Sequence, residues 1–216
     1  MKDINRFIQE RQKLLHTRVE EVRKSLIGMN PDLLARNSQA EYIREQTGRA
    51  YFKLRYWQDM ILINHPDFVA SRENGSELAT IHQALLMYYL STSDGASTSN
   101  EWISFSELPG GTFYHRAFQG YTGAELERGF SNEISLFSDT AIRSGGLRYD
   151  FADISFLFSI LPCVSLLVVG WRGDEDFQTT FQVLFNSRAA HFLPTDAYAI
   201  VGSILTQKIL SQLPTK

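Results

Sequence analysis

The sequence predicts an α+β fold in which an antiparallel sheet carries helices on one face and follows a long amphipathic N-terminal helix. Apolar residues recur at helical spacing near the N-terminus. Further along, apolar runs follow one another with links of hairpin length, which is typical of antiparallel strands. Neither a strand–GxGxxG–helix unit nor a GxxxxGK[ST] motif occurs in the sequence, and this argues against Rossmann and P-loop nucleotide sites.

The N-terminal helix is expected over residues 4–26, where arginines and glutamates alternate around the apolar positions. Gly28 is expected to end it, and Asn30 with Pro31 to start a second short helix that runs to Leu34. The predicted domain organisation is therefore a helical arm over residues 1–36 followed by a single α+β domain over residues 37–216.

The first half of this domain is expected to contain two strands, over residues 50–57 and 60–64, joined by a tight turn. Asn74 and Glu77 have the spacing of a capping box, which predicts a helix that begins there and runs to about Leu90. A short strand is expected over residues 102–105.

The second half is expected to begin with three helices and to continue with three strands and one last helix. The helices are predicted over residues 114–118, 123–130 and 133–143. The strands are predicted over residues 154–161, 164–171 and 177–185, and the last helix over residues 195–210.

The composition excludes several classes of protein. The chain is 44% hydrophobic and 21% charged, as in ordinary folded proteins, and its net charge of −3 disfavours nucleic acid as a partner. The only cysteine, Cys163, lies in an apolar run and is expected to be a small core residue. The N-terminus lacks a secretory signal, and Pro162 interrupts the most apolar stretch, so we expect a cytoplasmic protein without a membrane span.

The segment from Glu101 to His115 brings two carboxylates, two glycines and a histidine together. Gly110 and Gly111 allow main-chain N–H groups to approach a ligand, and His115 and Glu107 are candidate acid–base groups. The same residues are also typical of an aromatic-stabilised turn. The candidate ligand-binding residues are Trp102, Gly110, Gly111, Tyr114, Arg116 and Trp171, with Phe113 as a further wall.

The turn of residues 173–176 contains adjacent acids, of which Asp174 and Glu175 are candidate catalytic residues. Solvated acids on an exposed hairpin are the alternative. His82 lies on the apolar face of its helix and is as well explained by a partnered core position. His191 and Asp196 form one more pair of interest, and no HxH, HExxH or CxxC spacing predicts a metal site.

Four motifs carry a resemblance to a known family: Met87-Tyr88-Tyr89-Leu90 with Ser93-Asp94-Gly95, Trp102-Ile103-Ser104-Phe105 with Glu107-Leu108-Pro109-Gly110-Gly111, Gly173-Asp174-Glu175-Asp176-Phe177, and His191-Phe192-Leu193-Pro194-Thr195-Asp196. Over residues 77–200 the chain resembles the uncharacterised prokaryotic family called domain of unknown function 3786. Many members of that family are fused to, or encoded near, iron–sulfur and corrinoid methyl-transfer components. The resemblance implies small-molecule or tetrapyrrole-related work. This chain lacks the cysteines of such fusions, so the cluster function does not carry over.

Three functions remain open. The first is a protein that binds a small molecule, expected to be a planar anionic tetrapyrrole or corrinoid-type ligand. The second is a hydrolase or lyase on such a ligand, with carboxylate and histidine acid–base catalysis. The third is an accessory protein in which the N-terminal helix docks onto a protein partner or a second copy of the chain.

Overall fold

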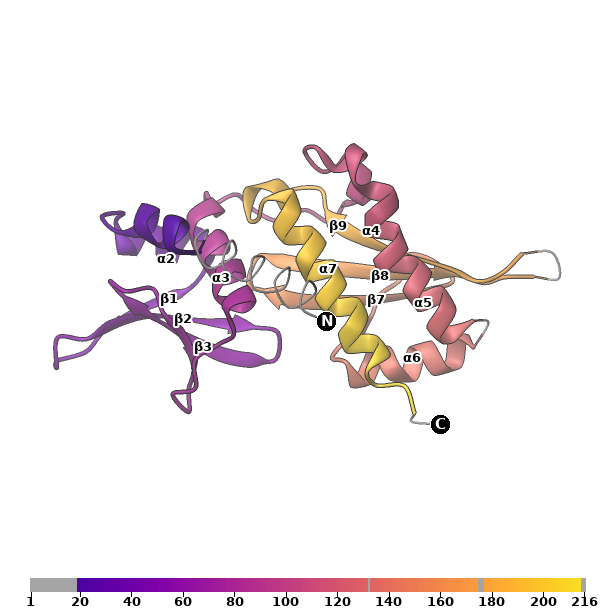
Figure 1. Cartoon of the computed structure of the whole chain (residues 1–216), viewed down its shortest axis with the longest axis horizontal. Helices are drawn as coiled ribbons and strands as arrows, with labels where there is room; N and C mark the ends of the chain where they lie inside the picture. The colour runs from indigo at the N-terminus through magenta and orange to yellow at the C-terminus, as the bar shows by residue number, and fades with distance from the viewer. Residues whose placement is uncertain (1–18, 132, 175–176, 215–216) are drawn as a thin grey trace, which may run out of the picture. The chain divides into compact units, whose positions relative to one another are not determined.

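The computed structural model describes residues 19–131, 133–174 and 177–214, which fold into two compact units (Figure 1). Of the described residues, unit 1 contains those up to Ala96 together with His191–Leu193, and unit 2 contains those of Ser97–Ala190 and those from Pro194 to residue 214. Each unit has helices and its own antiparallel sheet, so the α+β class is confirmed, although the strands form two sheets where one was predicted. The domain division predicted after residue 36 stays a prediction.

Unit 1 is built on a four-stranded sheet in the order β1-β2-β3-β4. The alternation along its second strand buries Phe52, Leu54 and Tyr56, as expected for a strand with one face in the core. The elements of unit 1 are α2 (Pro31–Ser38), β1 (Glu41–Arg44), β2 (Ala50–Tyr56), β3 (Asp59–His65), β4 (Ala70–Arg72) and α3 (Thr80–Thr92).

The start of α2 follows the predicted chemistry. The side chain of Asn30 accepts hydrogen bonds from the main-chain N–H groups of Asp32 and Leu33, so it caps the helix, and α2 continues to Ser38, beyond the predicted end. Residues 19–26 are helical, and Gly28 has a φ of 91° just after them. Residues 1–18, which make up most of the predicted N-terminal helix, lie outside the described residues.

The predicted start of α3 was wrong. Asn74 closes a local turn in which its side-chain oxygen accepts from the N–H and the hydroxyl of Ser76, and the helix begins six residues later, at Thr80. Its N-cap residue, Ala79, makes no side-chain cap. The capping-box spacing failed here because the Asn74 side chain is used by the turn itself.

Unit 2 is built on a five-stranded sheet in the order β5-β9-β8-β7-β6. The strands predicted over residues 154–161 and 164–171 and the last helix have the predicted bounds, whereas the strand predicted over residues 177–185 is found over residues 180–186. The helices of unit 2 are α4 (His115–Tyr121), α5 (Gly123–Phe130), α6 (Ile134–Arg143) and α7 (Thr195–Leu210). Its strands are β5 (Trp102–Ile103), β6 (Leu147–Arg148), β7 (Ile154–Leu161), β8 (Val164–Trp171) and β9 (Thr180–Asn186).

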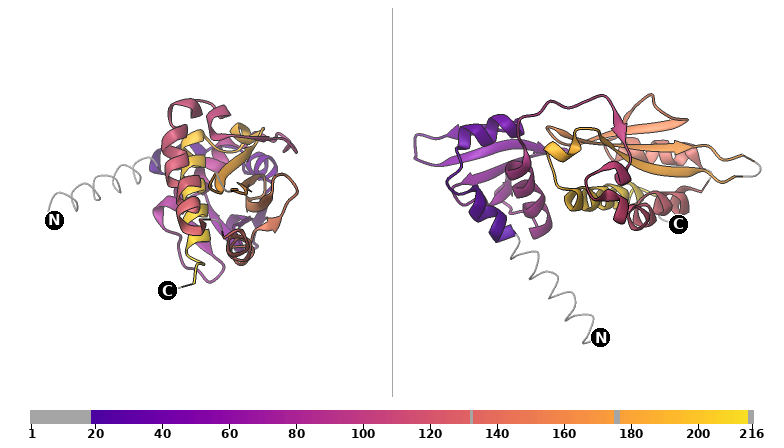
Figure 2. Two further views of the ribbon diagram at one scale, coloured as in Figure 1. Left: turned by 90° about the vertical axis from the view of Figure 1, so that its right-hand side faces the viewer. Right: turned by 90° about the horizontal axis from the view of Figure 1, so that it is seen from above.

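One face of this sheet carries the helices, as predicted. The rings of Phe181 and Phe185, two residues of the same face of β9, contact one aromatic ring from each helix, and Figure 2 shows helices gathered on one side of the strands. The helix residues in these ring contacts are Phe118, Phe130, Phe137 and Tyr198.

The other face of the sheet has a smaller apolar cluster. Leu167, Val169 and Leu184 are buried there beneath side chains that include Trp102 and Tyr149. The indole N–H of Trp102 lies 3.4 Å from the Tyr149 hydroxyl, and the two rings meet edge to face. Side chains from β5 and from the loop after β6 therefore pack on this face.

The short strands differ most from the prediction. The expected strand over residues 102–105 pairs only at Trp102 and Ile103 before the chain turns into the 3-10 helix η1 (Phe105–Glu107). β1, β4 and β6 were not predicted. Two to four residues are too few for a period of two to be recognised.

Candidate functional site

Two of the candidate site residues, His115 and Trp171, line one cavity at the outer edge of β9, called the His115 cavity below. Its volume is about 300 Å³, at the small end of the range for ligand sites. The lining comes from the β5–η1 segment, α4, α5 and the facing ends of β8 and β9. It consists of Ser104, Phe105, Ser106, His115, Phe118, Gln119, Glu127, Trp171, Thr180, Phe181, Gln182 and Val183.

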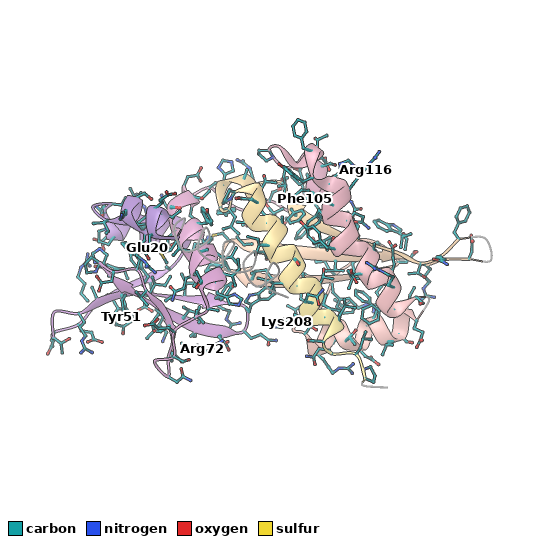
Figure 3. All side chains as sticks on the ribbon, viewed as in Figure 1. Glu20, Tyr51, Arg72, Phe105, Arg116 and Lys208 are labelled. Atoms are coloured by element: carbon teal, nitrogen blue, oxygen red, sulfur yellow. The ribbon has the colours of Figure 1, made fainter. Side chains whose placement is uncertain are left out.

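Aromatic side chains form the inner part of this cavity. The rings of Phe105 and Phe118 stack with centroids 4.2 Å apart and an interplanar angle of 10°, and both residues are buried. Phe105 is labelled in Figure 3 near α4, the helix that contains Phe118. Such an apolar inner wall with a few polar groups at the opening is typical of small-molecule sites.

His115 is held in one orientation at the opening. Its Nδ1 lies 2.7 Å from the main-chain carbonyl oxygen of Thr112, so Nδ1 must carry the proton that is donated to that oxygen. The neutral ring then has its lone pair on Nε2, which is the arrangement of a histidine prepared to accept a proton. His115 is exposed, so a ligand can reach it.

Glu107 lies just outside the lining and caps η1. Its carboxylate accepts hydrogen bonds of 2.7 Å from both the main-chain N–H and the hydroxyl of Ser104. Because Ser104 donates its only hydroxyl proton to Glu107, the 2.8 Å contact with Ser106 requires Ser106 to donate to Ser104. These bonds hold the pKa of the Glu107 carboxyl below its usual value, which favours the ionised cap over a general acid.

Gly110 and Gly111, the two glycines of the Glu101–His115 segment, are required by the conformation of the main chain. Gly110 has a φ of 72°, in the left-handed region. A Cβ on Gly111 would lie 1.9 Å from the carbonyl oxygen of Phe105, so this position has no room for a side chain. The main-chain N–H of Gly111 donates a hydrogen bond to the carbonyl oxygen of Leu108. Both glycines thus have structural roles in the loop beside the cavity.

The other candidate residues lie elsewhere. Tyr114 and Phe113 are exposed, and Arg116 projects outward from α4 (Figure 3). Trp102 belongs to the cluster on the opposite face of the sheet. Asp174 lines a different cavity, and Glu175 lies outside the described residues.

Two polar residues that line the His115 cavity had not been singled out from the sequence. Gln119 donates from Nε2 to the carbonyl oxygen of Phe181 at 2.8 Å, and the Phe181 N–H donates to Glu127 at 3.2 Å. The two side chains therefore occupy the edge of β9 as a neighbouring strand would. No local signal predicts this, since Gln119 and Phe181 are 62 positions apart.

His82, on α3 of unit 1, has a hydrogen-bond partner. His82 is half-buried, its Nδ1 lies 2.7 Å from the Tyr56 hydroxyl, and burial lowers its pKa. Burial also raises the pKa of Tyr56 to about 12. The partnered core position is thus what the structure shows for His82.

His191 pairs with Asp94, at 2.6 Å, rather than with Asp196. The hydrogen bond from His191 and a main-chain bond from Ala96 lower the pKa of Asp94. Asp94 of the Ser93-Asp94-Gly95 motif therefore contacts His191, and both residues belong to unit 1, as do Phe192 and Leu193.

Within the described ranges, no group of three or more His, Cys, Asp or Glu side chains is arranged to hold a metal ion. In the same residues, no helix combines the length and apolar character needed to cross a membrane.

The two units, with the cavities of unit 2, define an α+β protein with candidate small-molecule sites. The chain belongs to the DUF3786 family, described as a domain of unknown function, whose family model matches residues 30–208. This match confirms the resemblance and extends it beyond residues 77–200. Searches of curated proteins and of solved structures found no match.

Proposed function

We propose that this protein binds a small organic molecule in the His115 cavity. The observation that supports the proposal is that His115 and Trp171, chosen from the sequence as site residues, line one cavity with an aromatic inner wall. They come from segments more than fifty residues apart. A pocket with a few polar groups at an apolar wall is the usual form of a ligand site.

The lining limits what enters the cavity. No lysine or arginine is among the described residues that line it, and Glu127 contributes a carboxylate. A ring or an uncharged group therefore fits better than an anionic group. A volume of about 300 Å³ admits a part of a tetrapyrrole and leaves the rest outside.

A tetrapyrrole or corrinoid-type compound is the ligand class we propose to test first. One pyrrole ring would enter against Phe105 and Phe118, and the acidic arms would stay in solvent. Stacking on an aromatic wall contributes about 0.5–1.5 kcal/mol beyond area burial. Phe113 and Tyr114 are exposed and precede His115 in the sequence, so they are candidate aromatic contacts for the part that stays outside.

The second candidate function is that of a hydrolase or lyase with His115 as general base. The observation that favours it is the Nδ1–H bond to Thr112, which leaves Nε2 as the proton acceptor. The hydrogen bonds that keep Glu107 ionised leave it the role of holding Ser104 in place. Ser106, which hydrogen-bonds to Ser104, is the residue next to Glu107 and contributes a hydroxyl to the lining. A substrate with an acidic C–H or an activated leaving group suits a single base.

The third candidate function, docking of a partner or a second copy, is favoured by exposed apolar residues that follow the helical residues 19–26. Ile27, Met29 and Leu33 are 56%, 39% and 40% exposed. Changing all three to serine should reduce any self-association seen by light scattering. An unchanged mass would count against this role of the segment.

Native mass spectrometry of the purified protein, beside its denatured mass and an absorption spectrum, tests the binding proposal. The spectra are repeated after addition of protoporphyrin IX, hydroxocobalamin and their single-ring fragments. A bound mass that disappears in Ser106→Phe, which fills the cavity, supports the proposal. Binding that Ser106→Phe leaves unchanged places the ligand elsewhere and contradicts it.

A further inference from the structure

The largest cavity of unit 2 that we describe, about 700 Å³, lies beside the first turns of α6, the start of β7 and the turn after β8. It is called the Arg148 cavity below. Arg148 and Arg172 bring two positive charges to its lining, and Asp153 and Asp174 bring two negative charges. Among the described lining residues the formal charges therefore balance.

The positive charges are not neutralised by ion pairs. In the described part of the chain, neither Arg148 nor Arg172 has a carboxylate within ion-pair distance, and both residues are exposed. A guanidinium group that lines a cavity without a partner has its N–H fork available to a ligand.

Asp153 has a fixed position in the lining. Its Oδ2 accepts a 2.8 Å hydrogen bond from the main-chain N–H of Arg172, which joins the start of β7 to the end of β8. One carboxylate oxygen of Asp153 thus accepts a hydrogen bond from the main chain, and the negative charge of Asp153 remains in the lining of the cavity. Asp174 is held in a similar way, because its Oδ1 accepts from the N–H of Phe177 at 2.9 Å.

Arg148, Arg172 and Asp153 bring both charges to one cavity, and in the described part of the chain no ion pair joins them, so the cavity is complementary to a ligand that also carries both charges. A simple anion would be repelled by the carboxylate of Asp153, and a simple cation would be repelled by the two arginines. A zwitterion satisfies both. Arginine also binds a carboxylate in a bidentate manner, which gives the stronger charge-assisted bonds.

The space suits a ligand larger than a single amino acid. The Arg148 cavity has a volume of about 700 Å³, and a further hollow of about 350 Å³ is also lined by Arg148, Asp153 and Ile154. The hydroxyl of Ser138 donates to the carbonyl oxygen of Ile134, which leaves its lone pairs free to accept from an amide N–H.

We infer that the Arg148 cavity binds a short peptide with free ends. Arg148 and Arg172 bind its terminal carboxylate, and Asp153 binds its ammonium group. The site is separate from the His115 cavity: the two sets of described lining residues have no member in common.

Three matched probes test this assignment by isothermal titration calorimetry. Triglycine carries both charges, N-acetyl-triglycine lacks the ammonium group, and triglycine amide lacks the carboxylate. We expect triglycine to bind, and each blocked probe to bind at least about tenfold more weakly. Acetylated triglycine or inorganic phosphate that binds as well as triglycine would overturn the inference, as would the absence of triglycine binding at about 10 mM.

Variants locate the site. The Arg148→Ala and Arg172→Ala double variant and Asp153→Asn should each weaken triglycine binding about tenfold or more. Arg116→Ala, which removes an exposed charge outside both cavities, should leave the affinity unchanged. His115→Asn should also leave it unchanged, so failure of the peptide site and failure of the His115 site are distinguishable. Equal affinities in all four variants would overturn the assignment.

Discussion

Gln119 donates a 2.8 Å hydrogen bond from its side-chain nitrogen to the main-chain carbonyl of Phe181, and this bond closes the edge of β9 beside the His115 cavity. The contact requires a glycine at the start of α5. A Cβ on Gly123 would lie 2.0 Å from the Gln119 nitrogen and 2.2 Å from the Phe181 oxygen. The wall of the cavity therefore depends on close packing of α5 against β9.

Gly123→Ala should destabilise the protein by about 1–3 kcal/mol, the usual cost of overpacking. The added methyl group meets a main-chain oxygen that cannot move away freely. Urea unfolding measures the loss. Gly120→Ala is the matched control, because a Cβ on Gly120 has nothing within 4 Å, and it should be neutral or stabilising. Equal effects of the two variants would contradict the packing described here.

His115→Ala should abolish any turnover and weaken ligand binding in the His115 cavity, because it removes both ring nitrogens. His115→Asn separates the two roles. The asparagine amide can still donate to the Thr112 carbonyl, but it supplies no base. We expect His115→Asn to retain binding and to lose turnover, measured by titration and by product formation. Turnover retained in His115→Asn would show that His115 is not the base.

The stability of unit 1 should depend on pH through His82. Burial lowers the pKa of His82 below its unfolded value of about 6.5, so below this pH the unfolded chain binds a proton that the folded chain does not. Stability is therefore lost as the pH falls from about 6.5 through the lowered folded pKa. Melting temperatures between about pH 7.5 and 5 should fall less steeply in His82→Gln than in the wild type. Parallel curves would contradict a role for His82.

Asp94→Asn tests the contact of Asp94 with His191 in unit 1. The folded pKa of Asp94 is lowered by His191, so its contribution to stability is present above the unfolded pKa of about 3.9 and is lost as the pH falls through the folded value. The melting temperature of Asp94→Asn should be below that of the wild type at neutral pH and approach it in acid. A difference in melting temperature that stays constant at all pH values would show that the effect comes from side-chain packing and not from the charge of Asp94.

The sequence predicts the elements that are long enough to show a period. β7 (Ile154–Leu161), β8 (Val164–Trp171) and α7 (Thr195–Leu210) lie at the predicted positions because apolar runs and helical spacing extend over two turns or more. β4 (Ala70–Arg72) and β6 (Leu147–Arg148) could not be predicted, because their pairing depends on partners rather than on their own residues.

The candidate site could be predicted only in part, for a similar reason. His115 and Trp171 were recognisable as chemically useful residues, and they line one cavity. Glu107 has the same appearance in the sequence but serves as a cap, because Ser104 lies three residues before it. Arg148 and Arg172 carry no local motif, and only the sheet brings them to one cavity.

Fluorine nuclear magnetic resonance of protein labelled with 5-fluorotryptophan tests most directly whether a ligand occupies the His115 cavity. The chain has three tryptophans, and Trp171→Phe identifies the signal of Trp171. On addition of protoporphyrin IX or hydroxocobalamin, we predict that the Trp171 signal shifts to saturation. The Trp102 signal should stay in place, because Trp102 lies on the opposite face of the sheet. A bound ligand that shifts Trp102 and leaves Trp171 unchanged, or no binding of either compound, would contradict the account.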